Sequence, residues 1–385
     1  MPEAVIVDAV RTPLGKRNGA LSDWHPADLA AETLKALADR SSLDPSLVDD
    51  VVMGCVSQVG EQTWNIGRNA VLGAGWPETV PGVTIDRQCG SSQQAVHFAA
   101  QGVMAGAYDI AVGAGVESMT RVPMGSSANG GKPFGERMRA RYQDSLVPQG
   151  LSAEMIADRW GIGREELDEI GYESQMRAVR ATEEGRFDNE IVPIDVKVDG
   201  DVGVVNRDEG LRPTTTVESL GALRPAFKED GVVTAGNSSQ ITDGASALLI
   251  MSIERANELG LKPRARFVSF SLAGTDPVTM LTGPIPATQT AMAKAGLSIE
   301  DIDLFEVNEA FASVVGAWLR ETGADWEKVN VNGGAIALGH PLGASGGRLM
   351  TTLLNELERS GGRYGLQTMC EGGGLANATI IESLA

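Results

Sequence analysis

The chain has 385 residues, of which 42% are hydrophobic, 22% charged and 5% aromatic, so it is long enough for one large core or two similar ones. Its formal net charge of -19 argues against nucleic-acid or acidic-membrane binding, because polyanions would be repelled. No apolar run approaches the roughly 20 residues of a membrane helix, and the first residues lack the pattern of a secretory or transit leader. We therefore expect a cytoplasmic protein in which any anionic ligand meets a local basic patch.

Strand-like and helix-like stretches alternate along the chain, which predicts βαβ units and an α/β fold with a parallel or mixed sheet. An amphipathic helix is expected at 27–40. Apolar runs predict strands at 4–10, 48–56, 108–115, 248–252, 265–272, 303–308 and 364–370.

Two long segments, 84–118 and 329–374, share one design although their letters differ. In each, an extended piece meets a turn of small residues that carries one reactive side chain, a helix follows, and a strand ends in glycines. We therefore expect two similar halves. The N-terminal half is placed at residues 1–118 plus 246–262, the C-terminal half at 263–385, and an inserted loop domain at 119–245.

Cys89 follows a strand-like stub and precedes the small residues GSS. If a helix begins within two residues, unpaired backbone N–H groups and the helix dipole would favour the thiolate, which predicts a nucleophile. The alternative is a buried small hydrophobe, as most free cysteines are. Cys55 is expected to pack in this way, and the three dispersed cysteines predict neither a disulfide framework nor a metal site.

His340 lies in the glycine-rich segment GGAIALGHPLGASGG. Pro341 suits a first helical position, and a helix N-terminus would keep the imidazole neutral and able to accept a proton. The alternative is a cap or a satisfied core histidine. His25 is expected to cap a helix, and His97 lies too far along the Cys89 helix to act as the base for that sulfur.

Cys370 ends a strand that runs into Gly372, Gly373 and Gly374. Such glycines let backbone N–H groups point into a cavity and form an oxyanion hole, and a thiol beside them could move a proton. Asn308 stands where a strand meets a helix, and it could fix a water or a carbonyl. The alternatives are a packed cysteine and a plain N-cap.

Together these motifs occur in an order that closely resembles the thiolase family, the acetyl-CoA acyltransferases. The motifs are the Cys89 turn, NEAFA at 308–312, the His340 segment and CEGGG at 370–374, with further likeness at 113–125 and 234–247. The resemblance implies a thiolase-like duplicated fold, with two halves in a five-layer αβαβα arrangement and a loop domain between them. It also implies CoA-dependent cleavage of 3-ketoacyl-CoA and a homodimer or homotetramer, with coenzyme A as co-substrate and no permanent cofactor.

The resemblance assigns roles residue by residue. Cys89 would be the acylated nucleophile, His340 the base, Cys370 the acid/base at the substrate α-carbon, and Asn308 the holder of an oxyanion-hole water. The backbone N–H groups of Cys89 and Gly372 would form the second oxyanion hole. Arg212, among the basic residues of the insertion, would lie by the nucleotide, Ser239 by the pantetheine arm, and Met280 near the acyl group.

Two departures from the family pattern concern the substrate. Pro148 and Gln149 stand where many relatives have His-Met, and Asp86 replaces a residue that is often Asn. The segments GCVSQVGEQ and QCGSSQQA look more like thiolases of steroid or bulky acyl-CoA breakdown. The rival hypotheses are an acetoacetyl-CoA-forming acetyltransferase, a ketosynthase-type condensing enzyme and a non-catalytic CoA-binding protein.

Overall fold

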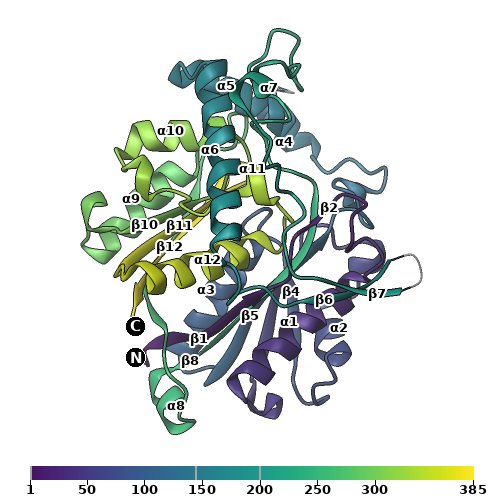
Figure 1. Cartoon of the computed structure of the whole chain (residues 1–385), viewed down its shortest axis with the longest axis vertical. Coiled ribbons are helices and arrows are strands. Elements are labelled where there is room, and N and C mark those ends of the chain that lie inside the picture. Colours follow the sequence, from purple (N-terminus) through teal and green to yellow (C-terminus); the bar gives the residue numbers. More distant parts are fainter. Residues whose placement is uncertain (1, 144, 199–200) are drawn as a thin grey trace.

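Figure 1 shows the computed structural model of the chain, which describes residues 2–143, 145–198 and 201–385. Within these residues a 10-stranded mixed sheet has the order β10-β11-β12-β9-β1-β8-β5-β3-β4, with β2 beside β8. Its strands are β1 (Ala4–Arg11), β2 (Gly15–Lys16), β3 (Asp50–Gly54), β4 (Gly82–Ile85), β5 (Ile110–Ser118), β8 (Thr242–Ser252), β9 (Ala265–Gly274), β10 (Leu304–Val307), β11 (Tyr364–Glu371) and β12 (Leu375–Ser383).

The sheet is built twice from the same pattern of pairings. In the first half, β1 pairs antiparallel with β8, β8 antiparallel with β5, and β3 parallel with both β5 and β4. In the second half, β9 pairs antiparallel with β12, β12 antiparallel with β11, and β11 parallel with β10. A parallel bridge from Phe305 to Val329 takes the place of the β3–β4 pair. The topology therefore confirms the expected duplication.

Helices cover the two half-sheets in layers. The first outer face carries α1 (Pro26–Ser41) and α2 (Ile66–Gly73), and the second carries α9 (Pro284–Ala295) and α10 (Ala312–Thr322). Between the half-sheets lie α3 (Ser91–Met104) and α12 (Ser345–Ser360), which pack on each other. Figure 1 shows the layers following one another from α9 and α10, through the two half-sheets with α12 and α3 between them, to α1 and α2, so the αβαβα fold expected from the sequence is confirmed.

Glycines allow the central helices to approach the strands and each other. A Cβ atom built on Gly113 of β5 would lie 2.7 Å from the Cα of Val96 in α3, and one on Gly346 of α12 would lie 2.7 Å from the Cβ of Gln93. Any larger residue would push the layers apart at these points. This close packing sets the position of the α3 N-terminus, where Cys89 lies.

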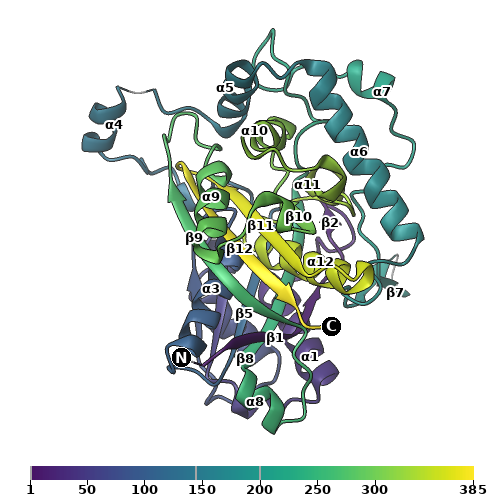
Figure 2. The same cartoon turned by 90° about the vertical axis from the view of Figure 1, so that its left-hand side faces the viewer.

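The insertion contains α4 (Glu136–Tyr142), α5 (Gln149–Trp160), α6 (Arg164–Glu183), α7 (Val217–Gly221) and the hairpin β6 (Ile194–Val198) and β7 (Asp201–Val205). The helices α5 and α6 of the insertion lie over the C-terminal half, and its hairpin packs on the N-terminal half. Figure 2 shows α4 on an arm that projects from the layers, whereas α5 and α6 pack near α10 and α11 (Ala335–Leu338). The short α8 (Ile253–Glu258) links the halves.

The expected boundary between the insertion and the returning N-terminal half, at residues 245 and 246, falls inside strand β8. β8 begins at Thr242, where it pairs with Lys16, and its next residue, Asp243, pairs with Ser118 of β5. The first half-sheet is therefore re-entered before residue 246. Across residues 2–143, 145–198 and 201–385, the structure contains no helix long and apolar enough to cross a membrane.

Candidate active site

Cys89 lies in a tight turn between β4 and α3. The turn reverses at Gln88, whose φ of 49° is left-handed, and the Gln88 N–H donates to Oδ1 of Asp86 at 2.6 Å. Gly90 is the N-cap of α3, which begins at Ser91. The helix therefore starts two residues after Cys89, as the sequence predicts.

Burial dominates the electrostatics of Cys89. The residue is 4% exposed, and loss of solvent raises the pKa of its thiol, with further contributions from Cys370 and Glu371. The backbone N–H groups of Gly372 and of Cys89 itself oppose this rise. Burial therefore opposes the thiolate that the helix terminus would favour. Cys89 needs a base to become nucleophilic.

Cys370 and Asn308 meet at the carboxyl ends of two adjacent parallel strands, β11 and β10. Nδ2 of Asn308 lies 3.8 Å from Sγ of Cys370. Burial raises the pKa of Cys370 to about 12, although the Asn308 hydrogen bond lowers it. Asn308 is not an N-cap, because α10 begins four residues later with Phe311 as its cap.

The Asn308 side chain joins this thiol to the histidine. Its Nδ2 lies 3.5 Å from Nε2 of His340, so one amide touches both Cys370 and His340. Its Oδ1 is buried and has no hydrogen-bond partner. A buried orphan acceptor normally has a water or ligand donor beside it, so the Asn308 amide marks a polar position between the two side chains.

The backbone around His340 departs from the sequence expectation. Gly339 has a φ of 107°, and α12 begins at Ser345 rather than at Pro341. The His340 N–H donates to Oγ1 of Thr242 at 3.1 Å and to the carbonyl of Gln240 at 3.2 Å. The histidine therefore lies in an extended turn before the helix, and Pro341 is not its first residue.

The imidazole is nevertheless neutral, for another reason. Burial, helped by the charge of Arg348, lowers the pKa of His340 to about 3. Nδ1 of His340 lies 2.6 Å from Oγ of Ser345, and that hydroxyl donates to the carbonyl of Pro341 at 2.8 Å. Because the single hydroxyl proton is used in this way, Nδ1 carries the imidazole proton and Nε2 offers a lone pair.

Glu117 is a residue of this region that the sequence analysis missed. Its buried carboxylate accepts hydrogen bonds from the N–H groups of Val56, Ser57 and Gly343 and from the amide of Gln62, at 2.8 to 3.0 Å. It therefore ties the loop after β3 to the loop that follows His340. The only sequence signal is one acidic residue at the end of an otherwise apolar strand, within GAGVES.

Two cavities lie beside this group of residues. A cavity of about 560 Å³ is lined by Met280, Gly372 and apolar residues near α4. Met280 has a left-handed φ of 51° and packs in the same core cluster as Cys370.

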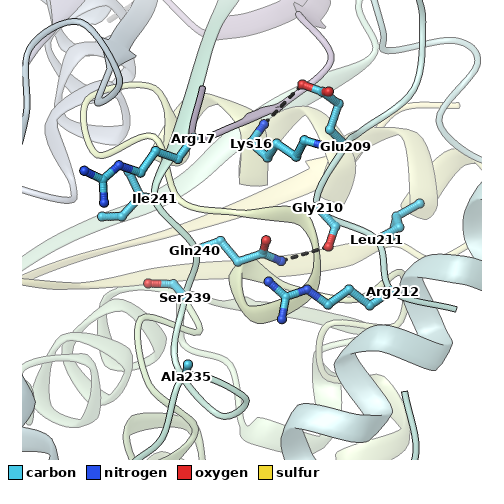
Figure 3. Close-up of a pocket in the computed structure, with 10 residues that line it drawn as sticks. All are labelled: Lys16, Arg17, Glu209, Gly210, Leu211, Arg212, Ala235, Ser239, Gln240 and Ile241. Atoms are coloured by element: carbon cyan, nitrogen blue, oxygen red, sulfur yellow. Dashed lines mark hydrogen bonds between the residues drawn. The ribbon is translucent and has the colours of Figure 1, made fainter. Parts of the chain in front are cut away.

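A second cavity of about 520 Å³ is lined by Arg212, Ser239 and Gln240, and it adjoins the site because the Gln240 carbonyl holds the His340 N–H. Figure 3 shows Arg17 and Arg212 on either side of Gln240. Arg17 and Lys16 also line this cavity but were missed, because they lie some two hundred residues earlier in the sequence.

The other two histidines and Cys55 have contacts that stabilise the fold. His25 caps α1 through Nδ1, which accepts from the Ala27 N–H. Nε2 of His97 lies 2.6 Å from Oγ1 of Thr379. Cys55 is fully buried in the core. In the described part of the chain, no group of three or more His, Cys, Asp or Glu side chains is arranged to hold a metal ion.

Comparison with known proteins identifies the family. The thiolase N-terminal domain profile matches residues 4–254, and the thiolase C-terminal domain profile matches residues 261–383. The chain belongs to the thiolase family. Thiolases are acyltransferases, so this thiolase is an enzyme of that class, and the ketosynthase-type and non-catalytic alternatives are not favoured.

Relatives of this thiolase match it over its full length. It is 51% identical to a steroid 3-ketoacyl-CoA thiolase, FadA6, of Mycobacterium tuberculosis, over 100% of this chain and 95% of the relative. It is 47% identical to a 3-ketoacyl-CoA thiolase of Aliivibrio salmonicida, over 99% and 100%. The crystal structure of the Bacillus anthracis acetyl-CoA acetyltransferase superposes with a TM-score of 0.92 at 40% identity, covering 100% and 99% of the two chains.

Proposed function

We propose that this thiolase cleaves 3-ketoacyl-CoA with coenzyme A, giving acetyl-CoA and a shortened acyl-CoA, through an acyl-enzyme on Cys89. The observation that carries the proposal is the meeting of Asn308, His340 and Cys370, with Cys89 electrostatically coupled to Cys370. The names of the relatives support the same reaction.

In the first half-reaction, Nε2 of His340 takes the Cys89 proton, and the thiolate attacks the substrate ketone. The bond between the α-carbon and the ketone carbon then breaks. Its electron pair passes to the α-carbon of the departing acetyl-CoA, and Cys370 protonates that carbon. Before this protonation, the negative charge lies largely on the thioester oxygen of the departing acetyl-CoA. A water held by Asn308 together with His340 would stabilise that charge.

In the second half-reaction, His340 passes the proton it took from Cys89 to the Cys370 thiolate. It then accepts the proton of the coenzyme A thiol, whose sulfur attacks the Cys89 thioester, and returns that proton to the Cys89 sulfur as it leaves. The backbone N–H groups of Cys89 and Gly372 would hold the oxyanion, because both already act on the Cys89 sulfur. Cys370 is returned to its protonated form, and Cys89 leaves as the thiol. No other cofactor is needed for this sequence of steps.

The cavity beside Gln240 is our proposed coenzyme A site. Lys16, Arg17 and Arg212 offer positive charge to phosphates on a protein whose net charge is -19, and Ser239 would contact the pantetheine arm. The apolar cavity beside Met280 is the proposed acyl site. Its mainly apolar lining supports an apolar acyl group, and the proposal of a bulky one rests on the steroid thiolase relative.

A rate panel tests the proposal and its substrate class together. Purified protein is given short, long and steroid-derived 3-ketoacyl-CoA with coenzyme A, and loss of the ketoacyl thioester is followed. We expect cleavage throughout, with the largest kcat/KM for bulky chains. Absence of cleavage with every substrate would refute the function, and a preference for acetoacetyl-CoA would refute only the bulky class.

We also propose that the protein acts in the cytoplasm as a dimer or a dimer of dimers. The strand β4 lies at the edge of the sheet, and the nearby apolar side chains of Val83 and Trp64 are 41% and 89% exposed. Free edges and exposed apolar groups favour association. Light scattering should therefore give at least twice the chain mass of 40.4 kDa, and a monomeric mass would contradict this part.

A further inference from the structure

The departure at Gln149 lies inside the proposed acyl cavity. Gln149 is the first residue of α5, and Gln88 immediately precedes Cys89. Both line the cavity, and every other lining residue is proline, glycine or apolar. Two amides in an apolar pocket are the usual means of fixing the orientation of a ligand.

The two amides flank one residue of the reacting centre. A Cβ atom built on Gly372 would lie 2.9 Å from Oε1 of Gln88 and 3.4 Å from Nε2 of Gln149. The Gly372 N–H acts on the Cys89 sulfur. A group held between the amides is therefore only a few carbon atoms from the carbonyl that Cys89 would attack.

Their remaining hydrogen-bonding capacity is complementary. Nε2 of Gln88 is directed at the Asp86 carboxylate, 3.4 Å away, which leaves Oε1 as an acceptor toward Gly372. Among the described residues, none forms a hydrogen bond with the Gln149 side chain, so its Nε2 is a free donor. A hydroxyl group both donates and accepts, and it satisfies both amides at once.

We infer that Gln88 and Gln149 select acyl chains that carry a hydroxyl group close to the reacting carbonyl over unsubstituted chains of the same length. This inference rests on the proposed function, because it assigns the substrate of the same site. An apolar chain would bury the two amides without forming hydrogen bonds to them, which weakens the binding of that chain. A site whose polar groups are placed to bind a hydroxyl therefore discriminates against the analogue that lacks it.

The test compares two acyl donors that differ by one hydroxyl, butanoyl-CoA and 3-hydroxybutanoyl-CoA. The measured quantity is the ratio of their kcat/KM values for acyl exchange with labelled coenzyme A. We expect at least about a tenfold preference for the hydroxyl compound, consistent with an unpaired polar group. Gln149→Met should abolish this preference, whereas Met138→Leu, a change to an apolar lining residue, should retain it. A ratio near one in the parent, or one unchanged by Gln149→Met, overturns the inference.

A binding measurement separates this inference from the proposed function. Exchange of both compounds at equal rates would refute the inference and leave the thiolase reaction standing. If neither compound exchanges its acyl group with coenzyme A, the acyl-enzyme is refuted. The inference is then decided by measuring the dissociation constants of the two compounds for the Cys89→Ala protein and for the Cys89→Ala, Gln149→Met double variant. We expect tighter binding of the hydroxyl compound only where Gln149 is present. Equal constants would overturn the inference.

Discussion

Nδ1 of His340 lies 2.6 Å from the hydroxyl oxygen of Ser345. Because that hydroxyl donates its own proton to the Pro341 carbonyl, its oxygen accepts a hydrogen bond from Nδ1–H of His340 and fixes the tautomer. The free lone pair on Nε2 faces Asn308. Ser345 therefore positions the proposed base without touching the substrate.

Removing this contact should weaken the base. In Ser345→Ala the imidazole can rotate and exchange tautomers, so we expect kcat to fall about tenfold to a hundredfold, part of the 10²–10⁴ that a positioned base supplies, with KM little changed. The matched control is Ser313→Ala, since Ser313 is buried but its hydroxyl has no partner. Steady-state kinetics of both variants checks this, and equal kcat values would remove Ser345 from the account.

Cys370→Ala should separate the two kinds of chemistry. Acylation of Cys89 by a simple thioester needs the base and the backbone N–H groups, so it should persist. Carbon–carbon cleavage needs a proton at the α-carbon, so it should fall by about 10² or more. Acyl exchange and ketoacyl-CoA cleavage are measured side by side, with Cys55→Ala as a buried-cysteine control. Cleavage at the parental rate would argue against the role of Cys370.

Glu371 should make the free energy of unfolding fall as pH rises from about 4.5 toward 9. Both its carboxylate oxygens are buried without partners, and burial raises its pKa from 4.5 to about 9. The folded state then holds the proton more tightly, so stability is complete below about pH 4.5 and declines as pH rises toward 9. Glu371→Gln should remove this decline, which amounts to at most about 1.4 kcal/mol in the free energy of unfolding per pH unit. Urea unfolding at pH 6 and 8 checks it, and a pH-independent difference from the parent would contradict a protonated Glu371.

His97 should act in the opposite direction. Burial lowers its pKa from 6.5 to about 3, so the unfolded chain binds the proton more tightly, and stability falls as pH drops from 6.5 toward 3. His97→Gln should reduce the pH dependence of the free energy of unfolding in this range by up to about 1.4 kcal/mol per pH unit. His340 is present in both proteins, so the difference isolates His97. Parallel stability curves between pH 7.5 and 5 would show that His97 is not the responsible group.

The sequence predicted the duplicated fold because it depends on local patterns, and the same patterns pointed to Asn308, His340 and Cys370, which the structure brings together. The repeated strand, turn and helix around Cys89 and His340 indicated the duplication, whereas the oxyanion hole expected from the glycines after Cys370 stays a prediction. The burial that raises the pKa of the Cys89 thiol was not predicted, since it depends on the layers that close over the residue. Glu117 and Arg17 were missed because their partners lie far away in sequence, and the helix start at Ser345 was missed because Pro341 suits an N-terminus equally well.

The central claim is that Cys89 carries the acyl group, and peptide mass mapping tests it most directly. After brief incubation with 3-hydroxybutanoyl-CoA or acetyl-CoA and acid quenching, the account predicts the acyl mass on the peptide that contains Cys89 and its loss in Cys89→Ala. An acyl group on Cys55 or Cys370 instead, or one that persists in Cys89→Ala, would contradict the account.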